Sequence, residues 1–439
     1  MSGRAGVVFV VCCVLASLGA FAAEITFVDV TEDAFPEGMS CSYYLWGDCD
    51  GDGYEDLLVG GKTIYINQGP PDFTFVKKGD LGDLSAGPHS RAQWLDVDND
   101  GDLDLFGIGG GDNERLYEND GSCFFTDISD MDGDGDPNDL GDGAPSTTCS
   151  VGDYDADGHV DVFVGNYERH CDDNVCADCT LDALWQNLGD GTLDNVYDDL
   201  GLAEAELNLA GYCVNAGTPC ESDADCAPYP QDSCKTGLCA RSSAWVDFND
   251  DGYLDLYVGN YRLDQNVMWQ NDGAGGFSNT APEHNLDGNE EQGDTYGHTL
   301  GVDWGDYDND GDMDVYIANL AHGWGWFLGD DHDHSELRQS DGADAYHFED
   351  VRPSSGMRQW SQAFDTDWSE FTPAWADYDN DGDLDIYVTH GYVLQDFAYS
   401  SLYSNDGDGT FTETTQDHGA NLKLFKNYWA AWADYDNDG

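Results

Sequence analysis

The chain of 439 residues carries 89 acidic and 15 basic side chains, which gives a formal net charge of −74. That charge alone would indicate a disordered acidic tail, but hydrophobic residues make up 40% of the sequence and aromatic residues 13%, enough for a substantial core. Because so acidic a surface repels phosphate groups, the composition excludes a nucleic-acid-binding protein.

The first 22 residues have the organisation of a secretory signal peptide. Arg4 supplies the positive start, residues 7–18 are a short apolar run, and residues 20–22 form a small-x-small cleavage site. The run is too short to cross a bilayer and no later stretch reaches that length, so we expect no membrane span. The sequence therefore predicts a signal peptide over residues 1–22 and a secreted domain over residues 23–439.

An acidic pattern recurs from residue 48 to the end of the sequence. Carboxylates or an amide occupy positions one, three and five of each copy, glycine follows at position six, and aspartate closes the pattern at position nine. The six complete copies are Asp48, Asp50, Asp52 and Asp56; Asp96, Asp98, Asp100 and Asp104; Asp153, Asp155, Asp157 and Asp161; Asp247, Asn249, Asp251 and Asp255; Asp306, Asp308, Asp310 and Asp314; and Asp377, Asp379, Asp381 and Asp385. A seventh copy begins with Asp434, Asp436 and Asp438, and the sequence ends before its closing position.

Alternate side chains in a tight loop converge on one point, and several carboxylates at one point require a cation. Ligands that are all oxygen select a hard ion, for which Ca²⁺ is the first choice. The glycine at position six can adopt the positive φ that lets the chain wrap around the ion. Identical spacing in six copies disfavours the alternative of solvated acidic turns, so we predict Ca²⁺ in these loops. Residues 130–135 hold half of the pattern, and whether they bind an ion stays open.

The residues around each loop have the character of β-strands. A tryptophan stands two residues before the first acid in every copy but the third, and β-branched and aromatic residues follow most of the closing acids. We expect these tryptophans to lie in the core, with a sugar-binding platform as the alternative. A second hairpin with an Asn-Asp-Gly turn follows at residues 119–121, 271–273 and 405–407.

Four short strands, repeated at intervals of about 50 to 60 residues, match the blade of a β-propeller. The sequence therefore predicts an all-β propeller of four-stranded blades, seven in number, whose last blade is truncated at Gly439. Residues 25–30 match the last strand of a blade and are expected to pair with the final blade, since closure leaves no free sheet edge.

An insertion rich in cysteine interrupts the third repeat at about residues 171–239. Of the 14 cysteines, two lie in the predicted signal peptide, and the even number that remains suits disulfides outside the cytosol. Between Cys213 and Cys239 the chain has little apolar content, so we expect disulfides to hold this segment together. Cys176 and Cys179 could be half of a zinc site, an alternative that the single Cys-x-x-Cys disfavours.

Two stretches carry a family resemblance. Residues 304–314, Trp-Gly-Asp-Tyr-Asp-Asn-Asp-Gly-Asp-Met-Asp, and residues 405–411, Asn-Asp-Gly-Asp-Gly-Thr-Phe, resemble FG-GAP/VCBS repeats. The Phe-Gly and Gly-Ala-Pro clusters of the integrin α-chain version do not recur with the loops, so the acidic ASPIC/UnbV branch is nearer. The resemblance implies a β-propeller, usually seven-bladed, with Ca²⁺ held by side chains at loop positions one, three, five and nine and by the carbonyl at position seven.

Catalytic motifs are absent from the sequence: there is no Gly-x-Ser-x-Gly and no His-Glu-x-x-His. Metal-ligand spacing already accounts for many of the acids, so a glycosidase pair has little support. His332 and His334 lie among acids, where a polar loop is favoured over a transition-metal site. We therefore predict a protein that is not an enzyme.

The function that these features favour is a secreted Ca²⁺-binding module for adhesion, binding or scaffolding. Its expected partner is an extracellular protein or glycan. Two alternatives stay open: a propeller enzyme acting on extracellular polysaccharide, and repeats that present a further domain encoded beyond Gly439.

Overall fold

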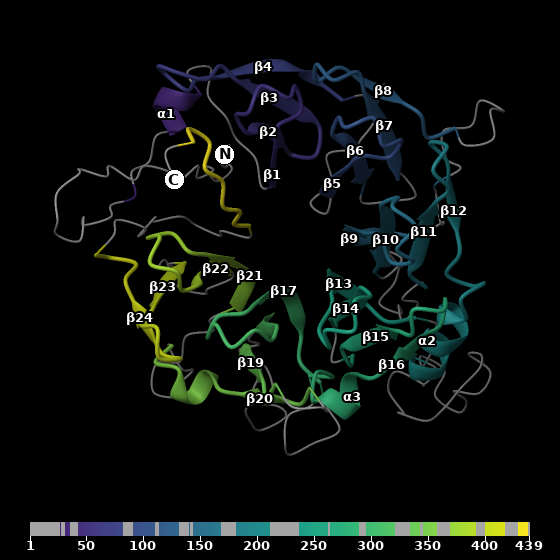
Figure 1. The fold of residues 1–439 in the computed structure, drawn as a ribbon, viewed down its shortest axis with the longest axis vertical. Helices are drawn as coiled ribbons and strands as arrows, with labels where there is room; N and C mark the ends of the chain where they lie inside the picture. Colours follow the sequence, from purple (N-terminus) through teal and green to yellow (C-terminus); the bar gives the residue numbers. More distant parts are fainter. Residues whose placement is uncertain are drawn as a thin grey trace, which may run out of the picture. The chain divides into compact units, whose positions relative to one another are not determined.

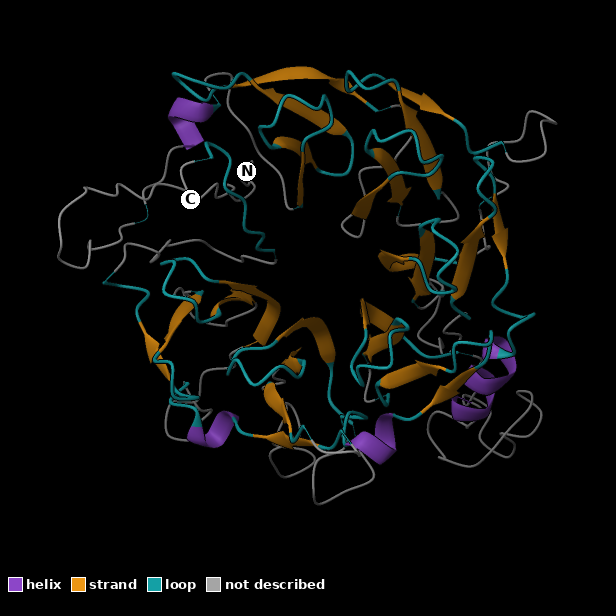
Figure 2. Cartoon of the chain, in the orientation of Figure 1, coloured by secondary structure: helices purple, strands orange, loops and turns teal. Residues whose placement is uncertain are grey.

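The computed structural model describes residues 27, 31–35, 43–81, 91–109, 114–130, 140, 144–167, 181–210, 237–261, 264–288, 296–320, 334–342, 346–357, 369–391, 400–417 and 429–437. The chain divides into two compact units. One unit comprises Met1–Gly82, Gly121–Cys123 and Leu300–Gly439, and the other comprises Asp83–Asp120 and Phe124–Thr299. Each unit is built from four-stranded sheets joined by loops (Figure 1, Figure 2).

Within every sheet, the strands are neighbours in chain order. The first unit contains three of the described sheets, although the first residue of β17 belongs to the second unit. These sheets are β1 (Tyr44–Gly47), β2 (Asp56–Val59), β3 (Thr63–Asn67) and β4 (Phe75–Asp80); β17 (Thr299–Gly305), β18 (Asp314–Asn319), β19 (Glu336–Ser340) and β20 (Phe348–Asp350); and β21 (Ser369–Ala376), β22 (Asp385–Gly391), β23 (Ser401–Asn405) and β24 (Phe411–Glu413).

The second unit repeats this organisation. Its described sheets are β5 (Arg91–Leu95), β6 (Asp104–Ile108), β7 (Arg115–Asn119) and β8 (Phe125–Asp127); β9 (Ser146–Gly152), β10 (Asp161–Asn166), β11 (Ala183–Asn187) and β12 (Leu193–Asn195); and β13 (Ala240–Val246), β14 (Asp255–Asn260), β15 (Val267–Asn271) and β16 (Phe277–Asn279). The structure thus confirms the predicted all-β propeller class with four-stranded blades.

Each acidic loop connects the first two strands of its sheet, as predicted. The closing aspartate is the first residue of the second strand, and the residue two before the loop pairs with the residue after that aspartate, as in Trp245↔Leu256 and Trp375↔Ile386. The second strands β2, β6, β10, β14 and β18 are buried along their whole length. Their continuous apolar runs reflect this burial on both faces.

Aromatic side chains repeat at the junctions between neighbouring sheets of a unit. Tyr154, at loop position two, stacks on Trp245 of the next sheet at 6.3 Å between ring centroids and contacts Phe277 at 5.8 Å. Trp245 also donates its indole N–H to the Ser150 carbonyl at 3.4 Å. The same three rings recur as Tyr307, Trp375 and Phe411.

This arrangement decides the role of the tryptophans that precede the loops. Trp375 is half-buried and donates its N–H to the Asp303 carbonyl at 3.3 Å, while Trp432 donates to the Ala374 carbonyl at 3.0 Å. Their rings pack between sheets and their polar atoms are hydrogen-bonded. The prediction that these tryptophans belong to the core is confirmed for these positions.

The beginning of the seventh repeat lies against the sheet β21–β24. Trp432 stacks on Tyr378 at 6.2 Å, and Phe27 contacts Tyr378 at 5.5 Å and Trp432 at 5.9 Å. Phe27 therefore takes the place that the outer-strand phenylalanine has in the other junctions. It is the one described residue of the segment 25–30, and its position is the one expected if that segment belongs to the final repeat.

The predicted number of seven blades is wrong for this structure, in which the described residues form six four-stranded sheets. Residues 429–437 form no strand. The physical reason is that residues 1–439 end inside the seventh loop, before the positions that build the second and third strands of the other repeats.

Among the described residues, helical segments that the all-β prediction omitted precede the first sheet or follow three of the later ones. They are α1 (Thr31–Ala34), α2 (Leu202–Ala210), α3 (Ala281–His284) and the 3₁₀ turn η2 (Arg352–Ser354). α2 buries Leu202 and Ala203 in the core of the second unit. No helix among the described residues is long and apolar enough to cross a membrane.

A buried asparagine at the end of the third strand joins neighbouring sheets. Asn405 donates Nδ2 to the carbonyls of Tyr307 at 2.7 Å and Leu384 at 3.1 Å, and its Oδ1 accepts the Gly407 N–H at 3.0 Å. The same three contacts recur at Asn67, Asn187 and Asn271. The residue predicted only as a turn former therefore also holds one sheet to the next.

Replacing Asn405 by alanine should lower the free energy of unfolding by about 2–4 kcal/mol, because two buried carbonyls lose their donor. Ser340 holds the same place in β19, where its Oγ accepts the Gly342 N–H at 3.4 Å and no other hydrogen bond within the part of the chain that the structure describes. Ser340→Ala is the matched control, with an expected loss below about 1 kcal/mol. Urea unfolding of both variants measures the difference, and equal losses would contradict the role assigned to Asn405.

Candidate metal centres

The first aspartate of each loop shapes the turn. In the fifth loop, Asp306 accepts the N–H groups of Asp310 and Gly311, each at 3.0 Å. The same pair of bonds occurs in the other five complete loops at 2.8–3.1 Å. The glycines at position six have φ between 88° and 100°, which confirms the predicted need for glycine there.

The turn brings the acids of positions one, three and nine together. In four of the loops, one oxygen from each lies within 4.8 Å of the others: Asp48, Asp50 and Asp56; Asp96, Asp98 and Asp104; Asp153, Asp155 and Asp161; and Asp306, Asp308 and Asp314. The position-five acid is not part of these four groups, since Asp310 Oδ1 accepts the Asp312 N–H at 3.0 Å.

The closing aspartate is buried and ties the loop to the sheet. Asp314 accepts the Ser340 N–H at 2.8 Å and the Tyr307 N–H at 3.3 Å. Burial raises the pKa of Asp314 to about 8. Burial likewise raises the pKa of the other closing acids to about 6 or 7: Asp56, Asp104, Asp161, Asp255 and Asp385. A cation beside such a carboxyl would favour its ionised form.

One oxygen in the first loop supports a cation directly. Asp50 Oδ1 is buried and has no hydrogen-bond partner among the described residues. The pKa of Asp50 is raised by burial and by the neighbouring charges of Asp52 and Asp48. Leaving a buried oxygen unpaired is costly, and the surrounding donors are all oxygen, so the loop fits a hard divalent ion such as Ca²⁺.

The fourth loop and the incomplete seventh loop differ from the other copies, and several predicted residues lie outside the described ranges. In the fourth loop, Asn249 Oδ1 accepts the Asp251 N–H at 3.0 Å, so the amide fills the position of an acid. Asp434 and Asp436 lie at the turn after Trp432, whereas Asp438 lies outside the described residues. The signal segment 1–22, Cys176, Cys179, His332 and the residues after Asp130 in the extra acidic segment also lie outside them.

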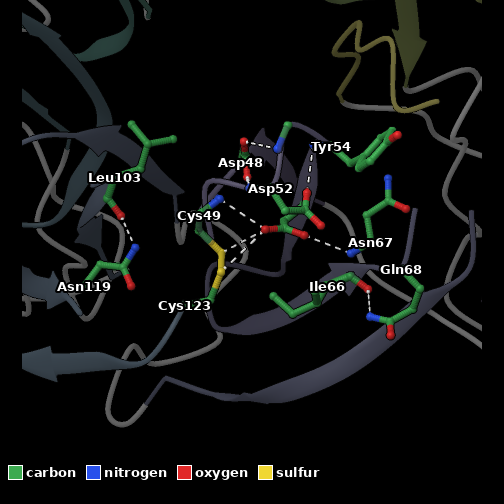
Figure 3. Close-up of a disulfide and its surroundings, with 12 residues drawn as sticks. Asp48, Cys49, Asp52, Tyr54, Ile66, Asn67, Gln68, Leu103, Asn119 and Cys123 are labelled. Carbon is green, nitrogen blue, oxygen red and sulfur yellow. Dashed lines mark hydrogen bonds between the residues drawn. A yellow bond between two sulfur atoms is a disulfide. The ribbon is translucent and has the colours of Figure 1, made fainter. Parts of the chain in front are cut away.

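A disulfide marks the first loop. Cys49, at the position held by Tyr154 or Tyr307 in other loops, is bonded to Cys123 (Figure 3). Both sulfurs approach Asp56 Oδ2, at 3.2 Å and 3.5 Å. Because the sulfurs are bonded to each other, they are not thiolate ligands for a metal.

Cysteine pairing elsewhere is partial. Cys239, at the end of the predicted insertion, is disulfide-bonded, whereas Cys149 is a free and buried thiol. The even number of cysteines suited disulfides but did not indicate which residues pair, and Cys149 stays free and packs in the core with Val162 and Val164.

The sequence did not indicate a second cluster, at the strand ends opposite the acidic loops of the second unit. The Arg241 guanidinium lies 4.4 Å from the Tyr167 ring centroid and 5.3 Å from that of Tyr261. Arg91 donates to the Arg241 carbonyl at 3.1 Å, and the His298 ring contacts Tyr261 at 4.9 Å. The available signal was the Asn-Tyr pair at the ends of β10 and β14, in which the asparagine is the last strand residue and the tyrosine follows it.

Comparison with known proteins identifies the repeats. A family model described as an FG-GAP-like repeat matches residues 48–107 and 247–317. No curated protein matches. The similar solved structures include an Agrocybe aegerita lectin that recognises non-reducing terminal N-acetylglucosamine, with 16% identity, a TM-score of 0.48, and coverage of 84% of this chain and 78% of that one.

Another similar structure is BBS1N in complex with ARL6DN, with 9% identity, a TM-score of 0.42, and coverage of 84% of this chain and 80% of that one. The matched segments contain complete acidic loops from both units. Residues 48–107 and 247–317 therefore contain FG-GAP-like repeats, which confirms the resemblance drawn from the acidic loops.

Proposed function

We propose that this protein is a secreted binding module whose sheets are stabilised by Ca²⁺. The observation that supports the proposal most strongly is the recurrence of three convergent carboxylates, one of them buried at the start of the second strand. The aspartates at positions one, three and nine would hold the ion. The ion would supply the positive charge that offsets their mutual repulsion and would tie each loop to its sheet.

Calorimetric titration with Ca²⁺ tests this proposal. We expect binding at the six complete loops, with the modest affinity suited to millimolar extracellular Ca²⁺. Asp308→Ala should remove one site. Asp272→Ala is the matched control, since Asp272 caps an exposed turn outside these loops, where it accepts the Gly276 N–H at 2.8 Å. Absence of Ca²⁺ binding to the wild type would rule the proposal out.

The partner we propose is an extracellular protein or glycan, bound without chemical conversion. The many acidic residues do not indicate a particular catalytic pair. The metal-ligand pattern and the hydrogen bonds of the position-nine aspartates already account for the acids in the loops. Extracellular location accords with loops that need millimolar Ca²⁺ and with the Cys49–Cys123 disulfide.

The Arg241 cluster favours a second candidate function, recognition of an anionic polysaccharide. Tyrosine faces suit sugar rings and a guanidinium suits a carboxylate or sulfate. Arg241, Tyr167 and Tyr261 are half-buried, and their cluster is notable in a chain with 15 basic residues.

With Ca²⁺ saturating, Arg241→Gln should weaken binding of a uronic-acid polymer about tenfold, as expected for loss of a charge-assisted contact. Lys77→Gln is the control, because Lys77 is an exposed cation paired with Asp80 at 2.8 Å in the first sheet. Isothermal titration measures both variants, and chromatography of the polymer detects cleavage. Failure of the wild type to bind any anionic polymer would remove this candidate.

A further inference from the structure

Asparagine side chains join the acidic loops of neighbouring sheets. Each occupies position four of its loop and donates Nδ2 to the carbonyl of the glycine at position six of the next loop. These bridging asparagines and their acceptors are Asn99 to Gly158 at 3.2 Å, Asn309 to Gly382 at 3.3 Å, and Asn437 to Gly53 at 2.6 Å. Each pair lies within one unit.

Position four suits this contact for two reasons. It has φ between 55° and 60° in the three bridging asparagines, a left-handed conformation that asparagine adopts more readily than most residues. It also follows position three directly, so an ion held by the position-three carboxylate fixes the neighbouring amide.

The glycine whose carbonyl accepts this hydrogen bond also lies in the middle of its loop. The Gly382 N–H donates to Asp377 Oδ2 at 3.0 Å, and Gly382 precedes position seven. Asn309 also donates to Asp383 Oδ1, the position-seven side chain, at 2.8 Å. One amide therefore links the middle of the fifth loop to the turn of the sixth.

We propose that the bridging asparagines make Ca²⁺ binding cooperative between the loops they join. The inference rests on the proposed function. An ion in the fifth loop orders Asn309, which holds the position-six peptide of the sixth loop in place and lowers the ordering cost for the next ion. By linkage, an ion in the sixth loop favours the fifth equally.

The third and fourth loops are an internal control, because no asparagine of the described residues bridges them. The third loop has Ala156 at position four, with φ of 57°, and a methyl group cannot donate to the fourth loop. Both of these loops lie in the second unit. Coupling is therefore expected between the loops beginning at Asp306 and Asp377, and not between those beginning at Asp153 and Asp247.

Hydrogen exchange followed by mass spectrometry reads the loops separately. The observable is the Ca²⁺ concentration at which residues 377–385 become half-protected. Asp308→Ala, which disables the fifth loop, should raise that concentration about two- to fivefold, the range that one hydrogen bond supports. Asn309→Gly should do the same, because Gly51 shows that glycine occupies this position in the first loop with φ of 68°.

Two comparisons make the test specific. Adding Asp308→Ala to Asn309→Gly should cause no further shift at residues 377–385. Asp155→Ala should leave the midpoint of residues 247–255 unchanged, and it is matched to Asp308→Ala because Gln186 and Gln339 donate to Asp155 and Asp308 in the same way.

An unchanged midpoint at residues 377–385 in Asp308→Ala, or an equal shift at residues 247–255 in Asp155→Ala, overturns the coupling while Ca²⁺ binding stands. A further shift in the double variant also overturns it. If the wild type shows no Ca²⁺-dependent protection in any loop, the proposed function itself fails and the coupling with it.

Discussion

Removal of Ca²⁺ with EGTA should lower the melting temperature by about 10 °C or more. An ion present at ten times its Kd contributes about 1.4 kcal/mol per site. Six sites would contribute about 8 kcal/mol, which is comparable with the net stability of a whole domain. Without the ions, at least four of the loops retain three carboxylates within a few ångströms, and their repulsion opposes folding.

Differential scanning calorimetry with and without the chelator measures this shift. Restoring Ca²⁺ in excess over EGTA should recover the original transition, which controls for effects of the chelator itself. An equal concentration of NaCl should not substitute, because the site needs a divalent ion with several oxygen ligands. Melting curves that coincide with and without EGTA would contradict ion-dependent stability.

Loss of the Cys49–Cys123 disulfide should lower the free energy of unfolding by about 4 kcal/mol. The two cysteines are 74 residues apart, so the cross-link removes much of the conformational freedom of the unfolded chain. In the first loop the disulfide also replaces the tyrosine that packs on the next sheet elsewhere. The double variant Cys49→Ser/Cys123→Ser avoids reducing other disulfides.

Cys149→Ala is the matched control for this variant. Cys149 is buried but free, so its replacement removes one sulfur and no cross-link, and should cost about 1–2 kcal/mol. Denaturant unfolding in saturating Ca²⁺ measures both proteins. A double-serine variant as stable as Cys149→Ala would show that the cross-link contributes little.

The repeated elements were the part of this fold that the sequence could predict. Fixed spacing placed the acids on one turn, and glycine at position six indicated the positive φ that the structure has at Gly311 and Gly382. The tryptophans two residues before the loops pointed to a repeated packing position, confirmed at Trp245 and Trp375. Repetition made these inferences secure because independent copies carried the same residue types.

Features that depend on contacts distant in sequence could not be predicted in this way. Asn405 appeared as a local turn residue, yet it donates to Tyr307 in the preceding sheet. Cysteine number did not reveal that Cys49 pairs with Cys123 while Cys149 stays free. These outcomes depend on which side chains the fold brings together.

The helix α2 was missed for a different reason. Residues 202–210 are a short helix-forming run without repeated copies elsewhere in the chain, so the repeat pattern that predicted the strands did not indicate it. Its Glu206 is buried and accepts the Tyr197 hydroxyl at 2.8 Å and the Leu238 N–H at 2.8 Å. Burial raises the pKa of Glu206 to about 7, which no local pattern reveals.

Anomalous diffraction from crystals grown in Ca²⁺ would examine most directly whether divalent ions occupy the aspartate turns. We predict a peak in each complete loop, bounded by the carboxylates of positions one, three and nine, such as Asp306, Asp308 and Asp314. Ordered loops without a peak, in crystals that hold millimolar Ca²⁺, would contradict it.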